Sequence, residues 1–87
     1  MSSRTVVISN DLGLHLRAAG TFVQVASQFE AEIWVERETM RANAKSIMSL
    51  LSLAAAKGTS LKITAEGADA TEAVDELVSL VERNFET

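Results

Sequence analysis

Hydrophobic side chains at every second position mark two strands in this chain. Residues 61–66 read Leu-Lys-Ile-Thr-Ala-Glu, so apolar and polar side chains alternate through six positions. Residues 32–36, Glu-Ile-Trp-Val-Glu, also look like a strand, with Ile33 and Val35 expected on one face. Alternation of this kind is typical of strands with one buried face, and it predicts that the other face of the sheet is solvated.

Two shorter segments are expected to complete the sheet. Residues 4–9 contain a run of β-branched side chains, Val-Val-Ile, which is bounded by Ser, Asn and Asp, residues that favour turns. Residues 40–42 form a weaker candidate that follows a charged turn. The sequence thus predicts four strands.

Two further segments have either the apolar periodicity of a helix or residues typical of helix ends. After Gly13, apolar side chains recur at spacings of three and four, as expected for one stripe on a helix. The members of this stripe are Leu16, Ala19, Phe22, Val23, Ala26 and Phe29. Because serine is a favoured N-cap, Ser46 is expected to open a second helix over residues 47–54, and Gly58 closes that region.

A third helix is predicted near the end of the chain. Asp69 and Glu72 have the spacing of a capping box, which satisfies free backbone N–H groups in the first turn. The apolar stripe that follows consists of Ala73, Val74, Leu77, Leu80 and Val81. The element order is therefore β-α-β-β-α-β-α, and because one sheet face is solvated, all helices must cover the other. Residues 1–87 are expected to form a single α+β domain, a two-layer sandwich.

Composition narrows the chemistry that this domain can perform. The 87 residues include no cysteine and one histidine, His15, which excludes thiol nucleophiles, disulfides and cysteine or multi-histidine metal sites. A net charge of −4 argues against electrostatic binding of nucleic acid or anionic membranes. No signal-peptide core or membrane-spanning stretch is visible. We therefore expect a cytoplasmic protein without a metal or cofactor.

The segment from Gly13 to Ala19, Gly-Leu-His-Leu-Arg-Ala-Ala, is the candidate for chemistry. His15 falls at the predicted start of a helix, where unpaired backbone N–H groups and the positive end of the dipole favour anions. The same positive end opposes protonation of the imidazole, so a ring nitrogen keeps a lone pair for nucleophilic attack. Arg17 adds a planar cation suited to phosphate oxygens. Together these groups would hold a phosphoryl group; alternatively, His15 is an exposed loop histidine and Arg17 a solvated helix residue.

Two motifs in the chain resemble those of a known family. The run from Gly13 to Ala19, followed about thirty residues later by Lys45-Ser46-Ile47-Met48, resembles HPr, the histidine-containing phosphocarriers of the bacterial sugar phosphotransferase system. The resemblance covers essentially the whole chain. It implies an open-faced sandwich, with a four-stranded antiparallel sheet covered on one face by three helices. It also implies that His15 carries phosphate on Nδ1 and that Arg17 assists the transfer.

The resemblance implies a relay component rather than a complete enzyme. His15 would accept a phosphoryl group from phosphorylated enzyme I and pass it to sugar-specific acceptor (EIIA) domains, with no cofactor of its own, and the chain would be a monomer. Residues 47–53 hold more apolar side chains than one buried stripe accommodates, so at least Met48 or Leu51 should be exposed. Partner contacts are expected from Leu16, Ala18, Gly20, Ile47, Met48 and Leu51.

Ser46 has two compatible interpretations. It is expected to cap a helix. In one branch of the family this serine is phosphorylated by HPr kinase/phosphorylase, which makes the carrier a regulator of carbon metabolism. The modification would add about two negative charges to the expected docking face.

The chain departs from the family pattern at two positions. Ala18 stands where proline is usual, which restores a backbone N–H donor in the first helical turn, and Leu16 stands where a small residue is usual. Two other functions remain open at this point. One is a regulatory HPr paralogue of the nitrogen-related branch, which acts by phosphorylation-dependent binding. The other is a plain interaction module in which His15 is idle.

Overall fold

The four strands form one sheet in the order β1-β4-β2-β3, in which every neighbouring pair is antiparallel. This computed structural model describes residues 1–86. The strands are β1 (Ser2–Val7), β2 (Glu32–Arg37), β3 (Met40–Asn43) and β4 (Ser60–Glu66). Because β4 lies between β1 and β2, the sheet joins the first strand of the chain to the last.

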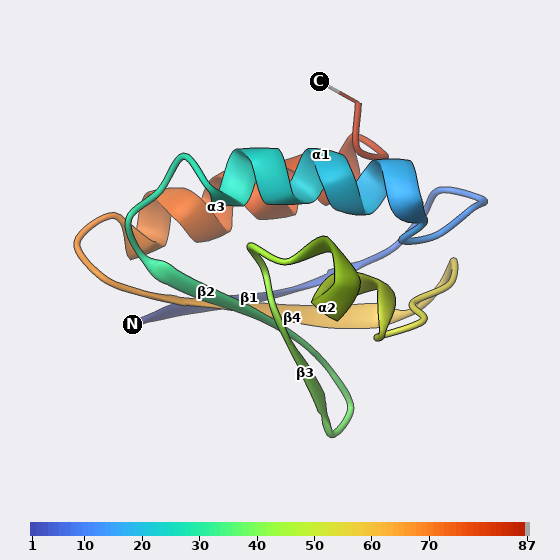
Figure 1. The fold of residues 1–87 in the computed structure, drawn as a ribbon, viewed down its shortest axis with the longest axis horizontal. Helices are drawn as coiled ribbons and strands as arrows, with labels where there is room; N and C mark the ends of the chain where they lie inside the picture. Colours follow the sequence, from blue (N-terminus) through green and yellow to red (C-terminus); the bar gives the residue numbers. More distant parts are fainter. Residues whose placement is uncertain (87) are drawn as a thin grey trace.

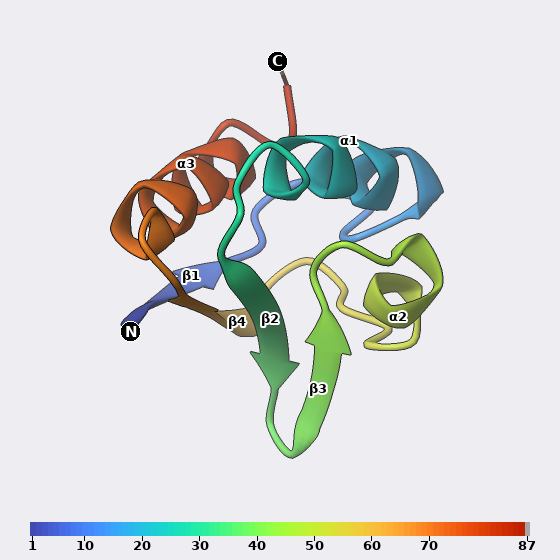
Figure 2. The same ribbon diagram turned by 60° about the vertical axis from the view of Figure 1, so that its left-hand side comes forward.

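Three helices cover one face of this sheet: α1 (Leu16–Ala26), α2 (Ile47–Leu51) and α3 (Ala70–Glu82). α1 and α3 lie side by side above the strands, and the short α2 lies beside β3 and next to α1 (Figure 1, Figure 2). The predicted element order and the two-layer α+β architecture are confirmed. No helix within residues 1–86 is long and apolar enough to cross a membrane.

The core lies between the helices and the sheet. Ile33 and Val35 of β2 are buried on the same side, as the alternation predicts, and Ile63 of β4 lies opposite Val35 and is also buried. Phe22 of α1 is buried in the same core cluster. The predicted α3 stripe completes the core; Ala73, Val74, Leu77, Leu80 and Val81 are all fully buried. Each large aliphatic side chain contributes about 1.5–3 kcal/mol on burial, so this layer is the main source of stability.

Within residues 1–86, no helix covers the opposite face of the sheet (Figure 2). Thr64 of the central strand β4 points to this side, and its hydroxyl oxygen lies 3.1 Å from Ser3 Oγ on β1. Trp34 of β2 is the cross-strand neighbour of Thr64. Its ring is partly exposed, and the Arg41 guanidinium lies 4.3 Å from the ring centroid, a cation–π contact. The predicted solvated face is therefore present, and Trp34 belongs to it.

β1 differs from its predicted range of residues 4–9. It starts at Ser2 and ends at Val7, because its length is set by pairing with β4 from Ser60 to Ala65. This pairing overrides the low strand propensity of the two serines. The other strands each extend one residue beyond the predicted range, at Arg37, Asn43 and Ser60.

The second helix is shorter than its predicted range of residues 47–54. α2 ends at Leu51, and the chain then turns, with Ala54 at a φ of +49°. Arg37 Nη1 donates a 2.7 Å hydrogen bond to the carbonyl oxygen of Leu53 in this turn. Arg37 Nη1 also donates to the carbonyl oxygen of Ala54 at 3.3 Å. Arg37 thus holds the turn that follows α2 through a long-range contact that a local pattern does not contain.

Leu16 is not part of the buried face of α1. The residues that α1 buries are Ala18, Ala19, Phe22 and Ala26. The Leu16 side chain is 66% exposed, because it lies in the first turn at the edge of that face. Phe29 follows the end of α1 and is partly buried against the core. The predicted stripe is therefore right at its centre and wrong at its first residue.

Asp69 does not form the predicted capping box. Its carboxylate makes no capping hydrogen bond to α3; instead it accepts hydrogen bonds of 2.9 Å from the backbone N–H groups of Glu30 and Ala31. The hydrogen bond from Glu30 is the main cause that lowers the pKa of Asp69; the Ala31 hydrogen bond and the Lys45 ammonium act in the same direction, and partial burial opposes them. Asp69 therefore fastens the turn that leads into β2.

Candidate functional site

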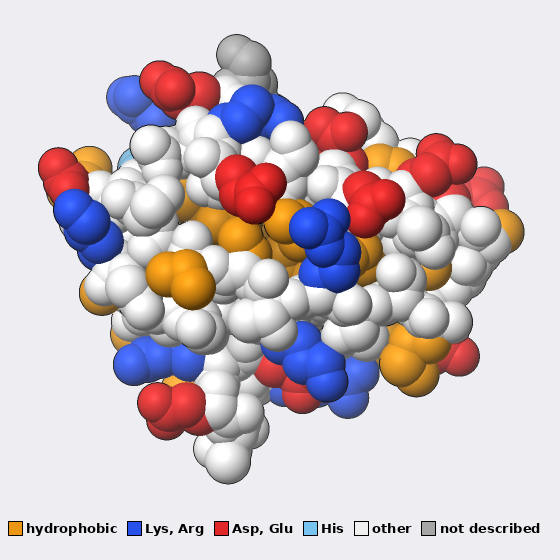
Figure 3. Space-filling view, turned by 180° about the vertical axis from the view of Figure 1, so that it is seen from behind, with side chains coloured by type: hydrophobic (Ala, Val, Ile, Leu, Met, Phe, Trp, Pro, Cys, Tyr) orange, Lys and Arg blue, Asp and Glu red, His pale blue; other side chains and the backbone are white. Residues whose placement is uncertain are grey.

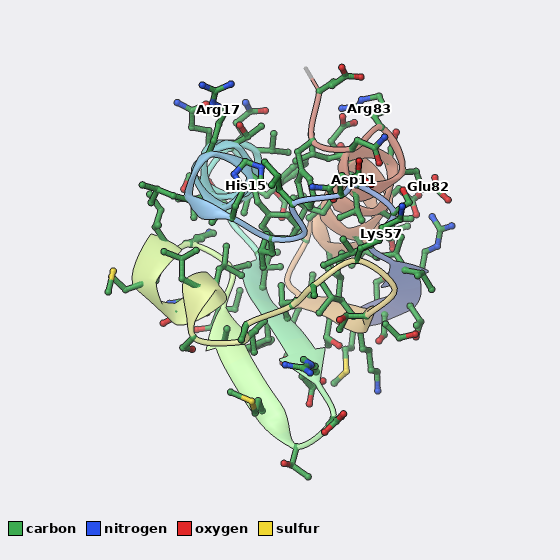
Figure 4. The ribbon with its side chains drawn as sticks, turned by 90° about the vertical axis from the view of Figure 1, so that its right-hand side faces the viewer. Asp11, His15, Arg17, Lys57, Glu82 and Arg83 are labelled. Atoms are coloured by element: carbon green, nitrogen blue, oxygen red, sulfur yellow. The ribbon has the colours of Figure 1, made fainter. Side chains whose placement is uncertain are left out.

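The loop of residues 8–15 carries His15 and is fastened to the loop that precedes β4. Leu14 donates its N–H to the carbonyl oxygen of Ala55 at 2.9 Å. Gly13 adopts a φ of +65°, a conformation that glycine reaches without a steric penalty. These features place His15 at the end of the molecule where α1 begins (Figure 4).

His15 is the N-cap residue of α1, with an extended backbone (φ −87°, ψ −180°). Its carbonyl oxygen accepts a hydrogen bond from Ala19 N–H at 2.8 Å, which opens the helix. The imidazole is partly exposed, and it makes no capping hydrogen bond to the helix. The ring is therefore accessible to a reactant that approaches from solvent.

The first turn of α1 leaves three backbone N–H groups without an acceptor in the described part of the chain, those of Leu16, Arg17 and Ala18. Unpaired N–H groups and the positive helix end attract anions. A proline at position 18 would leave two such donors, since it has no N–H. Ala18 thus supplies one donor more than a proline at this position would.

A surface depression of about 530 Å³ lies beside His15, and Arg17 lines it as well. Figure 4 shows the Arg17 side chain extending outward from α1 above His15. The structure therefore brings the two predicted residues to one site. The remaining lining residues are Leu12, Ala18, Thr21, Asn84, Phe85 and Glu86. Sequence reasoning missed residues 84–86, because they carry no motif and reach His15 only through the fold.

An exposed apolar rim accompanies this site. Leu16 and Met48, both expected to contact partners, are 66% and 75% exposed, and Leu12 is 75% exposed. We call these three residues the apolar rim. α2, which carries Met48, lies next to the start of α1 (Figure 4). Leu12 is a leucine in a predicted turn, which is the sequence sign of its exposure. Sequence reasoning did not single it out.

The other expected contact residues are less accessible. Ile47 and Leu51 are partly buried against the core. Gly20 lies close to Ile47, whose Cδ1 would be 4.0 Å from a Cβ atom at position 20. The side chain of Ala18 is only 1% exposed, because it belongs to the buried face of α1. Its methyl group is thus too buried to supply contact area to a partner.

Ser46 caps α2 as predicted. Its Oγ accepts a hydrogen bond from Ser49 N–H at 3.2 Å, and its carbonyl oxygen accepts one from Leu50 N–H at 3.1 Å. The side chain is partly exposed. Since Met48 follows two residues later, a negative charge on Ser46 would lie beside the apolar rim.

Acidic side chains gather on α3 rather than around His15. Figure 3 shows Asp and Glu side chains on the α3 side of the molecule, with Lys and Arg among them. The exposed acidic residues of α3 are Glu72, Asp75, Glu76 and Glu82. Two of them form surface ion pairs, Arg4–Asp75 at 3.2 Å and Arg83–Glu76 at 3.9 Å, of a kind that contributes little stability. Within residues 1–86, no group of three or more His, Asp or Glu side chains is arranged to hold a metal ion.

The chain matches known proteins over nearly its whole length. Residues 2–83 match the family model described as PTS HPr component phosphorylation site. Phosphocarrier protein HPr from Neisseria meningitidis serogroup A is 47% identical over 85 residues, which cover 98% of this chain and 96% of that protein. The crystal structure of HPr-C-His from Thermoanaerobacter tengcongensis has a TM-score of 0.94 at 47% identity, and the match covers 98% of this chain and 96% of that one.

A second crystal structure of HPr from Thermoanaerobacter tengcongensis is described as a dimer. It has a TM-score of 0.79 and 46% identity, and the match covers 100% of both chains. Dimers therefore occur among similar proteins, and the expectation of a monomer for this chain stays a prediction.

Proposed function

This chain belongs to the HPr family of phosphocarrier proteins of the phosphotransferase system, and from that premise we propose that His15 is the residue that carries the phosphoryl group. Phosphorylated enzyme I would be the donor, and sugar-specific EIIA domains would be the acceptors. The observation that carries the proposal is the position of His15 directly before three unpaired N–H groups, with Arg17 in the same depression.

The transfer exchanges one bond to phosphorus for another. A lone pair on the His15 imidazole, on Nδ1 by resemblance to the family, attacks the phosphorus atom carried by enzyme I. The new N–P bond forms while the bond to the donor breaks, and the donor leaves with that electron pair. Passage to an EIIA domain repeats the exchange with His15 as the leaving group. The chain is therefore a carrier, because it passes on unchanged the phosphoryl group that it receives.

The protein supplies fixed positive partners for this exchange. Charge in the transition state of phosphoryl transfer spreads over the three equatorial oxygens, so donors that are already oriented lower the barrier. The N–H groups of Leu16, Arg17 and Ala18 are such donors, and the Arg17 guanidinium offers a bidentate fork. Because Arg17 is exposed, its side chain is free to meet the oxygens as the two proteins approach.

Docking of enzyme I and of EIIA domains would use the apolar rim. Leu12, Leu16 and Met48 expose large apolar surface, Leu12 lines the depression beside His15 and Leu16 follows His15 in the chain, and exposed apolar patches often mark partner sites. Leu16, Gly20, Ile47, Met48 and Leu51 stay in the proposed contact set, while Ala18 contributes through its backbone. Both partners would meet the same surface in turn, which fits a relay between two proteins.

Ser46 would be the regulatory site of the same surface. Phosphorylation by HPr kinase/phosphorylase would place about two negative charges at the start of α2, beside Met48. The positive helix end stabilises such a group, whereas an approaching apolar partner would have to desolvate it. The modification would therefore weaken docking without unfolding α2.

A regulatory HPr paralogue of the nitrogen-related branch is the alternative. Leu16, an exposed leucine where the family usually has a small residue, is the observation that favours a different set of partners. Such a protein would accept phosphate on His15 but control other proteins by binding. Transfer from the phosphorylated chain to purified EIIA domains separates the two functions, because only the carrier passes its phosphate to a sugar-specific domain. We place either form in the cytoplasm.

The test of the carrier role is phosphate uptake at His15. The chain is incubated with phosphoenolpyruvate and enzyme I, and acid-labile phosphate is located by mass spectrometry. We expect one phosphate on His15 in the natural chain and none in His15→Ala, with unchanged thermal stability because the ring is accessible and makes no capping bond. Uptake by His15→Ala at the natural level would contradict the assignment, and no uptake by the natural chain would favour the plain interaction module.

The role of Arg17 has a separate test. Arg17→Lys keeps the charge and loses the planar fork, so we expect slower transfer from enzyme I without a comparable loss of stability. Equal transfer rates for the two chains would remove the guanidinium from the mechanism.

A further inference from the structure

Asn10 makes two hydrogen bonds within the loop that carries His15. Its carbonyl oxygen accepts a hydrogen bond from Gly13 N–H at 3.1 Å, and its side-chain Nδ2 donates to the carbonyl oxygen of Gly13 at 2.8 Å. The same Gly13 oxygen accepts the His15 N–H at 3.0 Å. The carboxamide of Asn10 and the backbone of His15 therefore meet at one oxygen atom.

The other end of this carboxamide has no partner. Asn10 Oδ1 is buried and accepts no hydrogen bond within residues 1–86. A buried acceptor without a donor destabilises the folded chain, which offsets the gain from the Nδ2 hydrogen bond. Alanine at position 10 would remove both, and the Gly13 oxygen would keep its bond from His15. The Asn10 side chain therefore contributes little net stability.

The carboxamide of Asn10 instead fixes the orientation of the peptide group that follows Gly13. Because the Gly13 carbonyl is held between two donors, the peptide that follows it and the His15 N–H keep one orientation. Rates of group transfer fall steeply when a reacting group is misplaced by about 1 Å. Asn10 does not line the depression itself, so its effect on the ring would pass through Gly13.

We propose that Asn10 is a positioning residue for phosphoryl transfer at His15. Its hydrogen bond to Gly13 orients the start of α1 so that the imidazole and the free N–H groups meet the phosphoryl group together. The inference rests on the proposed carrier function of His15, and it adds a residue that touches neither the phosphoryl group nor the partner.

The test compares Asn10→Ala with the natural chain as substrates of phosphorylated enzyme I. We expect the maximal transfer rate to fall about fivefold, the effect of one lost hydrogen bond of ordinary strength. The KM of enzyme I should not change, because the apolar rim is untouched. Unfolding in urea should give the same free energy for both chains, and the His15 amide should exchange with solvent faster in the variant.

Two further variants make the result specific. Asn10→Asp keeps the shape of the side chain but replaces the donor with a carboxylate that repels the Gly13 oxygen, so we expect it to be at least as slow as Asn10→Ala. Ser3→Ala is the matched control, because it also removes one side-chain hydrogen bond, to Thr64 on the open sheet face. Its transfer rate and its His15 amide exchange should equal those of the natural chain.

The outcomes distinguish this role from the carrier function itself. A natural chain that takes up no phosphate on His15 contradicts the carrier function, and the role of Asn10 falls with it. A natural chain that transfers normally, with Asn10→Ala at the same maximal rate, contradicts the role of Asn10 alone. A large loss of stability in Asn10→Ala also overturns the proposal, because the side chain would then have a structural role. A full rate in Asn10→Asp overturns it as well, because the shape of the side chain rather than its donor would then matter.

Discussion

A Cβ atom on Gly13 would lie 2.5 Å from the carbonyl oxygen of Ala55, far inside van der Waals contact. The next residue, Leu14, donates its N–H to that same oxygen and so joins the His15 loop to the segment that holds Ala55. The glycine is therefore needed twice, once for its positive φ of +65° and once for the close approach of two backbones. This contact is where the His15 loop joins the body of the protein.

Gly13→Ala should destabilise the chain and displace His15. A left-handed backbone and a backbone clash together cost about 1–3 kcal/mol or more, and the loop must move away from Ala55 to relieve them. Urea unfolding gives the stability, and transfer from enzyme I gives the activity; both should fall. Gly58→Ala is the control, since Gly58 also has a positive φ (+90°) but nothing lies within 4 Å of its Cβ position. Equal losses in the two variants would mean that the contact with Ala55 is unimportant.

Gly20→Ala should stabilise the chain. Gly20 lies inside α1, where alanine is favoured over glycine by about 0.5–1 kcal/mol. The new methyl group would meet only Ile47 Cδ1, at 4.0 Å, which is an ordinary contact distance. A thermal melt should show a higher Tm, by about 4–8 °C for each kcal/mol in a domain of this size. A lower Tm would show that Ile47 needs the space above Gly20.

Ser46→Asp should separate stability from docking. Aspartate is also a good N-cap, and its charge suits the positive helix end, so the Tm should be no lower than that of the natural chain. The charge lies beside Met48, and a docked partner must partly desolvate it, so the KM of enzyme I should rise. Ser46→Asn caps the helix without a charge and should leave the KM unchanged. An unchanged KM for Ser46→Asp would place Ser46 outside the docking surface.

Asp69 should make stability depend on pH in the acid range. Its pKa in the folded chain lies below the ordinary value of 3.8, chiefly because the Glu30 N–H donates to the carboxylate. The stabilisation is therefore complete above pH 3.8 and disappears as the pH falls through the lower folded value. Asp69→Asn should be less stable than the natural chain at pH 7, and the difference should shrink on acidification. A constant difference down to the lowest pH would show that the charge has no part in it.

Periodicity predicted the parts of this fold that depend on a buried face. Ile33 and Val35 stand two residues apart, as expected for one face of a strand, and the α3 stripe recurs at helical spacing, so the period of the buried positions locates both elements. Leu16 fits the same spacing and yet is exposed, because a stripe does not show where the core stops. Periodicity is reliable in the middle of an element and weak at its first turn.

The candidate site was predicted where its residues are neighbours in sequence. His15, Arg17 and the free amides of the first helical turn follow from one short segment. Leu12 and residues 84–86 line the same depression, but no local pattern brings the two ends of the chain together. Asp69 shows the same limit, since its spacing to Glu72 indicates a cap, whereas its true partners lie about forty residues away.

The strand order has a consequence for how the molecule is made. β1 has its sheet partner only in β4, and the loop that follows β1 is tied to Ala55. During synthesis, the segment that carries His15 leaves the ribosome before Ala55 and β4, and it must wait for both of these contacts. Contacts between such distant segments also form late in folding, because closing a long loop precedes any gain from them. A chain that has not yet reached β4 therefore lacks the built surface beside His15, and the proposed phosphoryl transfer would have to wait for that strand.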